Sequence, residues 1–313
     1  MKTIYDAQTD MPLAPMAATI GMFDGVHRGH RMVIDRLRAA AASRGLRSGV
    51  VTFASHPQLL FHPDCGMRLL TSVDEKTRLL AATGLDYAMV FTFTHEFAAM
   101  TARDFMAMLR ERFNVRLLVV GYDHHFGRRS DETADDYRRY GDQLGIEVVV
   151  TPELTGGCHI SSSAIRQSLA EGDVAAAAAM LGRGYTLTGT VTTGKRNGRL
   201  IGFPTANIDL QGLPLLVPAD GVYAVRATVG GDTYGGMLNI GTPSVSADSR
   251  RTIEVNIFNF DRDIYGATVT LEFVARVRDC RRMDGLDDLR RQLSADRIAI
   301  QKILTQPSLY EYH

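Results

Sequence analysis

Residues 17–30 read AATIGMFDGVHRGH, and this stretch decides the fold of the first half of the chain. It begins as a β-rich apolar run and ends at His30, where a helical pattern opens. Gly21, Gly25 and Gly29 lie between the two. A glycine-rich turn from a strand into a helix presents backbone N–H groups and the positive end of the helix dipole to an anion. The stretch therefore predicts a phosphate-binding turn at the carboxyl end of a buried strand.

Short apolar runs alternate with helical patterns along the first half of the chain. The runs are apolar at nearly every position, as in strands buried on both faces of a parallel sheet. This alternation predicts a doubly wound, Rossmann-like α/β domain whose ligand lies beyond the carboxyl ends of the strands. The runs are residues 17–21, 49–53, 87–93, 117–121 and 146–150, and the helical patterns include residues 30–42, 72–82 and 102–113.

Strand patterns dominate the second half, from about residue 184 onward. Gly230 and Gly231 separate two apolar runs, which indicates a two-residue hairpin turn. Residues 253–257 and 269–273 alternate with period two, as half-buried strands do. A final helix is expected at about residues 286–304. The pattern predicts a small antiparallel β-barrel with a C-terminal helix, and two domains at residues 1–183 and 184–313.

Composition excludes several classes of partner. Lys plus Arg and Asp plus Glu both number 35 among 313 residues, so no net charge favours nucleic acid or a membrane surface. The three cysteines are far apart and lack paired metal spacing, which is typical of reduced thiols. No signal peptide or bilayer-spanning segment is recognisable, so the expected location is cytoplasmic. Self-association is left open.

His27 and His30 are candidate catalytic residues. They lie one helical turn apart at the predicted phosphate turn, where two imidazoles can hydrogen-bond phosphates and stabilise a departing pyrophosphate. A surface pair or half of a zinc site is the alternative, but no partner ligands stand at metal spacing. The expected ligand-binding residues of the turn are Gly21, Phe23, Asp24, Gly25 and Gly29.

Residues 160–166 predict a second anion cradle, in which serines cap a helix and Arg166 lies on its first turn. A plain helix cap has the same sequence. Together with His27–His30, however, this segment resembles the signature pieces of class I nucleotidyltransferases, particularly the bacterial FAD synthetase branch. Residues 52–57 and 119–127 resemble further motifs of that branch, and the resemblance covers nearly all of residues 15–182. It implies ligand contacts at His56, Pro57, Asp123, Phe126, Gly127, Ser161, Ser162, Ser163 and Arg166.

The resemblance implies adenylyl transfer. The phosphate of FMN would attack the α-phosphorus of ATP, and positioning and charge stabilisation would carry the catalysis without a protein nucleophile. Ser162, Ser163 and Arg166 would hold the triphosphate, and Asp123 would orient ligands or magnesium. Two positions depart from the family pattern: Met22 replaces an asparagine, and residues 124–125 replace Phe-Arg.

Residues 200–207 read LIGFPTAN and follow a glycine-rich basic segment that contains Gly194, Lys195 and Arg199. The segment can fold over a triphosphate but is not a Walker loop, because no Ser or Thr follows the lysine. The hydroxyl of Thr205 and the amide oxygen of Asn207 are hard ligands suited to Mg²⁺ that carries ATP phosphates. The run resembles the riboflavin kinase signature, which implies ligand contacts at Gly202 and Pro204 as well.

Glu254 is the candidate general base of this second site. A glutamate on an alternating strand is usually a solvated residue of the outer face, but its position matches the catalytic glutamate of the kinase family. Two departures stand nearby. Residues 242–245 lack an arginine of the family pattern, and Asn256 replaces a common histidine.

These resemblances identify the chain as a member of the bacterial bifunctional riboflavin kinase/FAD synthetase family. They imply ATP-dependent phosphorylation of riboflavin to FMN, followed by adenylylation of FMN to FAD, with Mg²⁺ as cofactor. The alternatives are an FAD synthetase with a weakened or inactive kinase module, a flavin-binding regulatory protein without turnover, and a relative of aminoacyl-tRNA synthetases.

Overall fold

The computed structural model describes residues 1–6, 13–62, 64–121, 126–128, 132–151, 160–193, 198, 201–242 and 251–306. By internal contacts the chain divides into two compact units, Met1–His159 and Ile160–His313. This division lies before the helices α7 (Ser162–Ala170) and α8 (Val174–Leu181), of which α8 contacts the strand β12 (Thr268–Arg278) of the second unit. The division into two functional domains at residue 183 therefore stays a prediction.

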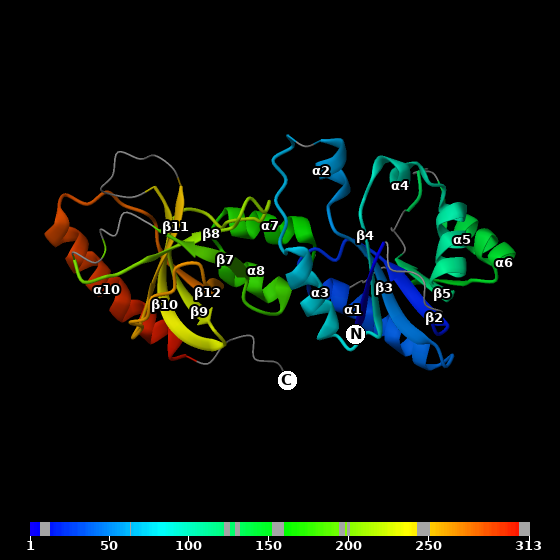
Figure 1. The fold of residues 1–313 in the computed structure, drawn as a ribbon, viewed down its shortest axis with the longest axis horizontal. Helices are drawn as coiled ribbons and strands as arrows, with labels where there is room; N and C mark the ends of the chain where they lie inside the picture. The colour runs from blue at the N-terminus through cyan, green and yellow to red at the C-terminus, as the bar shows by residue number, and fades with distance from the viewer. Residues whose placement is uncertain are drawn as a thin grey trace. The chain divides into compact units, whose positions relative to one another are not determined.

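The first unit is built on a six-stranded parallel sheet with the order β1-β4-β3-β2-β5-β6 (Figure 1). The chain runs from the central β2 outward to β4, then returns to the other side of β2 for β5. The carboxyl ends of β2 and β5 therefore form the switch point at which such sheets bind ligands. The strands are β1 (Lys2–Tyr5), β2 (Met16–Ile20), β3 (Arg47–Phe53), β4 (Tyr87–Phe91), β5 (Val115–Gly121) and β6 (Glu147–Thr151).

Helices cover both faces of this sheet, which confirms the doubly wound prediction. One hydrophobic core joins α1 (Arg28–Ala42) and α3 (Val73–Ala81) to alternate residues of the strands, such as Val50 and Leu117. A second core joins α5 (Ala102–Arg112) and α6 (Ala134–Leu144) to the intervening residues, such as Val51 and Leu118. Two short helices, α2 (Pro57–Phe61) and α4 (His95–Ala99), follow β3 and β4.

The second unit contains a closed six-stranded antiparallel barrel, as the strand pattern predicts. Its order is β10-β11-β8-β7-β12-β9, and the expected hairpin joins β9 to β10 through Gly230 and Gly231, both with positive φ. Closure removes the exposed edges that an open sheet of this size would have. The strands are β7 (Thr186–Thr192), β8 (Ala206–Asp209), β9 (Gly221–Val229), β10 (Asp232–Gly241), β11 (Thr252–Ile257) and β12.

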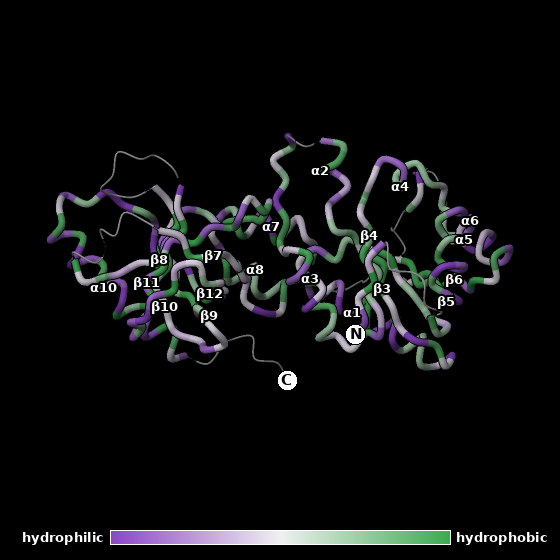
Figure 2. The backbone as a smooth tube through the Cα atoms, in the orientation of Figure 1, coloured by the Kyte–Doolittle hydropathy of each residue, from purple (hydrophilic) through white to green (hydrophobic). Residues whose placement is uncertain are grey.

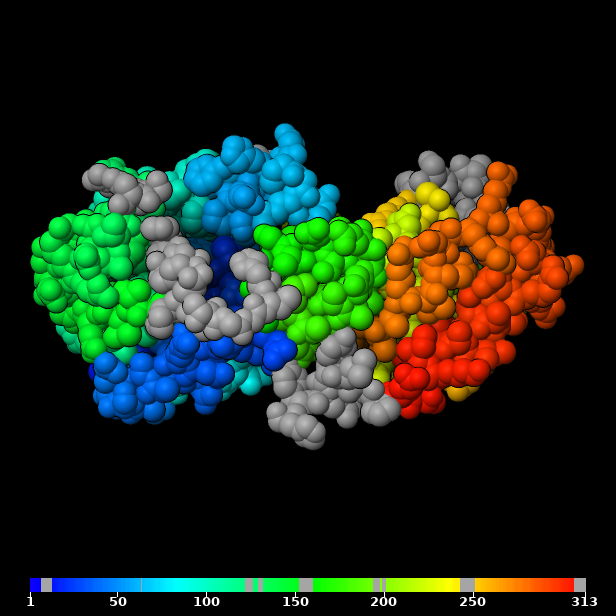
Figure 3. All heavy atoms as spheres, turned by 180° about the vertical axis from the view of Figure 1, so that it is seen from behind, coloured from blue at the N-terminus to red at the C-terminus, as the bar shows by residue number. Residues whose placement is uncertain are grey.

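The predicted C-terminal helix, α10 (Leu286–Leu304), packs on the outside of the barrel against β9, β10 and β12. Hydrophobic and hydrophilic residues alternate along it (Figure 2), and its outward side is uncovered in the space-filling view (Figure 3). Its inward residues, including Ile300, meet Met237 of β10 in a small core. Met237 therefore marks the outer face of the barrel wall.

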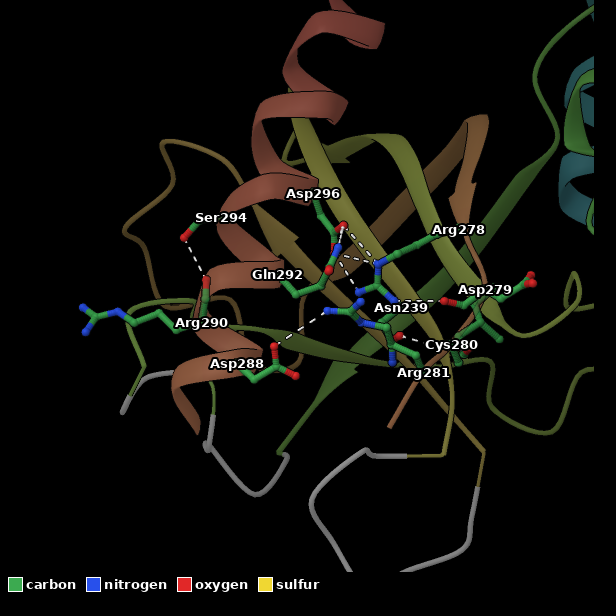
Figure 4. A network of polar contacts seen from close by, with 11 residues as sticks. Asn239, Arg278, Asp279, Cys280, Arg281, Asp288, Arg290, Gln292, Ser294 and Asp296 are labelled. Atoms are coloured by element: carbon green, nitrogen blue, oxygen red, sulfur yellow. Dashed lines mark hydrogen bonds and ion pairs between the residues drawn. The ribbon is translucent and has the colours of Figure 1, made fainter. Parts of the chain in front are cut away.

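An ion pair buried beneath α10 fixes the helix to β12 (Figure 4). Arg278 Nη2 donates to Asp296 Oδ2 at 2.7 Å, and its Nε lies 3.0 Å from each carboxylate oxygen. Gln292 Nε2 donates to Asp296 Oδ1 at 2.6 Å. The Asp296 side chain is only 3% exposed. Removing one partner of such a pair leaves a charge without its counter-ion in a poorly solvated place.

We expect Asp296→Ala to lower the free energy of unfolding of the barrel unit by about 3 kcal/mol. The same substitution at Asp288 is the matched control on the same helix. Asp288 is 3.8 Å from its arginine partners and more exposed, so its loss should cost less than ~0.5 kcal/mol. Chemical denaturation of both variants measures the difference. Equal effects would show that the Arg278–Asp296 pair does not anchor the helix.

Candidate active sites

The turn after β2 has the strand-turn-helix geometry expected of a phosphate site. Its backbone is tight, with positive φ at Phe23 (49°), Gly25 (83°) and Val26 (39°). Helix α1 begins at Arg28, two residues before the predicted start at His30. The reason is the cap: His27 is the N-cap residue, and its Nδ1 accepts the His30 N–H at 3.2 Å. His27 therefore shapes the helix terminus that the sequence assigns to phosphate.

The two histidines form one compact group. Their rings are stacked with centroids 3.6 Å apart, and Phe23 packs edge-on against His30 at 5.1 Å. Burial lowers the pKa of His30 well below its ordinary value, and the charges of His27 and Lys76 lower it further. His30 is therefore neutral at neutral pH. Its Nδ1 is buried and has no hydrogen-bond partner among the described residues, which leaves bonding capacity for a ligand.

Asp24 makes several hydrogen bonds within the protein, and its expected contact with a ligand stays a prediction. Its side chain is buried and accepts the N–H groups of Leu70 and Thr71 at 3.0–3.1 Å and the Thr71 hydroxyl at 3.2 Å. Thr71 Oγ1 in turn accepts the Gly25 N–H at 3.2 Å. These bonds tie the turn to the segment before α3. The structure thus gives Asp24 a role in holding the turn in shape.

Aromatic side chains gather where β3 and β4 end, and the sequence did not single them out. Phe53, the last residue of β3, packs edge-on against Phe93 at 5.4 Å and against Phe97 of α4 at 5.3 Å. Phe61 of α2 joins them, with its ring 6.2 Å from that of Phe93, and is 49% exposed. Phe53 lies in the motif at residues 52–57, but the pairing of β3 with β4 is what brings it to Phe93 and Phe97, which stand in no predicted motif.

Several other predicted contacts lie on or near α2 and β5. His56 caps α2, with its Nδ1 3.2 Å from the Gln58 nitrogen, and Pro57 is the first helical residue. Phe126 is 9% exposed and stacks on Tyr137 in the second core, so it packs the domain interior. Gly127 is required at its position, because a Cβ there would lie 2.6 Å from the backbone of Ala102. Asp123 lies outside the described residues.

The serine segment forms the helix cap that the sequence predicts. Ser161 Oγ accepts the Ala164 N–H at 3.2 Å at the start of α7, and Ser162 and Ser163 are the first helical residues. Arg166 is the fifth helical residue and so begins the second turn of α7, one position later than expected. The role of this segment toward a triphosphate stays a prediction.

In the barrel, the strand register places Glu254 between two asparagines. Glu254 of β11 lies directly opposite Asn207 of β8 and directly opposite Asn239 of β10. Directly paired residues share a face of a sheet, and that face is the outer one, because it also carries Met237. Glu254 is half-buried, and its Oε1 lies 3.3 Å from the Thr252 hydroxyl. Asn239 was not predicted, since only the register reveals it.

Asn256 connects this row to the turn before β8, which holds Thr205, one of the two predicted metal ligands. It is 5% exposed, and its Nδ2 donates to the Pro204 carbonyl at 2.7 Å. Its Oδ1 is buried without a partner among the described residues. Pro204 and Thr205 are exposed, Asn207 is half-buried, and Gly202 has a φ of 81°. Gly194, Lys195 and Arg199 lie outside the described residues, as do positions 243–245 of the departing segment.

The donor set of the barrel fits Mg²⁺. A hydroxyl at Thr205 and an amide oxygen at Asn207 are neutral hard ligands, and Mg²⁺ in nucleotide sites takes few protein ligands beside the substrate phosphates. Among the described residues no group of three or more His, Cys, Asp or Glu side chains could hold a metal ion. None of the helices in the described part of the chain is long and apolar enough to cross a membrane.

The chain thus joins a doubly wound domain that has a histidine-capped turn to a barrel in which a carboxylate lies between two amides. The family model of FAD synthetase matches residues 10–164, and that of riboflavin kinase matches residues 181–304. The bifunctional riboflavin kinase/FMN adenylyltransferase of Escherichia coli (strain K12) is 36% identical over 295 residues, 93% of this chain and 94% of that protein.

Two further relatives have similar coverage. The protein of the same name from Listeria monocytogenes is 34% identical over 305 residues, which are 95% of this chain and 96% of the relative. The crystal structure of a macrolide-efflux protein from Streptococcus pneumoniae superimposes with a TM-score of 0.85 and 33% identity, covering 96% of this chain and 98% of that one. The chain belongs to the bifunctional riboflavin kinase/FMN adenylyltransferase family.

Proposed function

We propose that each activity of the family is carried by one of the two sites described above. The barrel phosphorylates riboflavin to FMN, and the doubly wound domain adenylylates FMN to FAD. The row Asn207–Glu254–Asn239 supports this assignment most strongly, because it sets one carboxylate among neutral amides on a half-buried surface. A carboxylate in that setting can accept the proton of a bound hydroxyl.

In the kinase reaction Glu254 accepts the proton of the ribityl 5′-hydroxyl while the hydroxyl oxygen forms a bond to the γ-phosphorus of ATP. ADP leaves as the bond between the γ-phosphorus and the bridging oxygen breaks. Thr205 and Asn207 would hold Mg²⁺, which neutralises phosphate charge when bound. Asn256 holds the Pro204 carbonyl and thereby fixes the turn that carries Thr205 and leads into β8, where Asn207 lies.

In the adenylylation reaction a phosphate oxygen of FMN attacks the α-phosphorus of ATP, and pyrophosphate leaves. His27 and His30 lie at the helix terminus that faces the phosphates, and the neutral His30 acts by hydrogen bonding. The edge-on aromatic group of Phe53, Phe61 and Phe93 offers apolar surface to the isoalloxazine ring, mainly through the exposed Phe61. Ser161, Ser162, Ser163 and Arg166 are proposed to hold the triphosphate.

A cytoplasmic location and dependence on Mg²⁺ belong to the same proposal. Both reactions use ATP, and Mg²⁺ is the usual partner of ATP phosphates. Membership of an enzyme family favours turnover over a regulatory role for these sites.

The direct test is to incubate the pure protein with ATP, Mg²⁺ and either riboflavin or FMN, and to follow FMN and FAD by chromatography. We expect FAD from both flavins. If FAD forms from FMN but not from riboflavin, the result would instead support the alternative with an inactive kinase module. The altered segment at residues 242–245 is the sequence feature that favours this alternative.

We expect Asn256→Asp to raise the KM of the kinase for ATP about tenfold, because a carboxylate cannot donate to the Pro204 carbonyl. Asn256→His restores a donor and should stay within about threefold of the original enzyme. Steady-state kinetics of riboflavin phosphorylation measures both variants, and FMN adenylylation by the same samples controls for folding. Equal KM values in the two variants would contradict the role of the hydrogen bond.

A further inference from the structure

Lys76 is a buried lysine to which neither proposed mechanism assigns a role. It lies on α3, on the inner side of the helix, and is 4% exposed. Its Nζ donates to the carbonyl of Met22 at 3.2 Å and to the carbonyl of Phe53. The Thr52 hydroxyl also donates to the Met22 carbonyl, at 3.0 Å. The ammonium therefore lies where the phosphate turn after β2 meets the end of β3.

This ammonium lacks a contact counter-ion among the described residues. Its two hydrogen bonds go to neutral carbonyls, and Asp24 attracts it only at longer range. A buried charge without a paired partner is costly. An apolar side chain would pack α3 without that cost, so packing alone does not account for a lysine here. The cost is offset when an anion binds above the turn. A polyphosphate is the anion that the turn is built to receive.

We propose that Lys76 is an electrostatic positioning residue for the triphosphate of ATP in the adenylylation site. It supplies the fixed positive charge beneath the histidine turn, and it holds the Met22 carbonyl so that the turn keeps its shape. The inference rests on the proposed adenylylation in this domain. The charge of Lys76 also adds to burial and to the charge of His27 in lowering the pKa of His30.

The proposal predicts proton uptake when ATP binds at alkaline pH. Burial lowers the pKa of Lys76 to about 8, against an opposing attraction from Asp24. At pH 8.5 most of the free protein therefore has a neutral Lys76. A bound triphosphate raises that pKa, so binding should take up roughly 0.5 proton or more. His27, His30 and Asp24 also face this region, and all three are unchanged in the variants below.

Two variants separate the charge from the packing. Lys76→Met removes the charge and the donors, whereas Lys76→Gln removes the charge and keeps an amide donor for the carbonyls. The matched control is Arg78→Met, which removes an exposed cation from the same helix, where it pairs with Glu75 at 2.7 Å. We expect both Lys76 variants to lower kcat/KM for FMN adenylylation at least ~30-fold, mostly through the KM for ATP. Riboflavin phosphorylation should stay within about twofold in all three.

Calorimetry in two buffers of different ionisation enthalpy measures the proton uptake on ATP binding at pH 8.5 without flavin. We expect the uptake of the original protein to disappear in Lys76→Gln and to persist in Arg78→Met. Unchanged uptake in Lys76→Gln, or adenylylation within about twofold of the original, would overturn the proposal. Failure of the unmodified protein to adenylylate FMN would instead overturn the proposed function, so the two failures are distinguishable.

Discussion

Replacing Glu254 with glutamine should lower the rate of FMN formation from riboflavin by about 10²–10⁴-fold, the usual contribution of a general base. The glutamine keeps the size and hydrogen-bonding geometry of the side chain but cannot accept the hydroxyl proton. Conversion of supplied FMN to FAD should be unchanged, because the residues proposed for adenylylation do not include Glu254. Initial rates with riboflavin and with FMN, measured on the same preparation, give both values.

Glu272→Gln is the matched control for this substitution. Glu272 is a glutamate on β12 of the same barrel, 3.9 Å from Arg226, and belongs to no proposed site. It should leave both rates within about twofold. A kinase rate that survives Glu254→Gln would exclude Glu254 as the base. Loss of both activities in a folded variant would refute the assignment of the reactions to separate sites.

Replacing His30 with alanine should lower FMN adenylylation about 10²–10³-fold, since each preorganised donor at developing charge contributes on that scale. The alanine removes the ring that stacks on His27 and the hydrogen-bonding capacity beside the phosphate turn. Riboflavin phosphorylation should continue, and FMN should accumulate. Chromatography of the products from riboflavin shows this directly.

His62→Ala serves as the control, because His62 is an exposed histidine at the C-terminal end of α2. It should change neither rate by more than about twofold. Adenylylation by His30→Ala within about twofold of the original enzyme would remove His30 from the mechanism.

The architecture of both domains could be predicted from the sequence, because each rests on local periodicity. Runs such as residues 117–121 are short, apolar and β-rich, which indicates buried strands, and residues 286–304 carry a helical pattern along their whole length. The strand β1 could not be predicted in this way, because it has only four residues, of which only Ile4 is buried. Too little apolar surface is present to distinguish it from a chain terminus.

Some residues of the two proposed sites could be predicted from the sequence, and others could not. His27, His30 and Glu254 could be found because they stand in signatures at fixed spacing. Asn239 could not, because the strand register alone sets it opposite Glu254. Lys76 stands among the polar residues of an amphipathic helix, where a lysine is usually solvated, and only the packing of α3 shows that it is buried.

Mixing the Glu254→Gln and His30→Ala variants tests the central claim, that two independent sites in one chain carry successive reactions. Neither variant alone should convert riboflavin to FAD. Together with ATP and Mg²⁺, they should form FAD, because FMN released by the kinase site of one variant reaches the adenylylation site of the other. If the mixture forms no FAD while each variant retains its remaining activity, the two reactions do not proceed through free FMN at separate sites, and the account is contradicted.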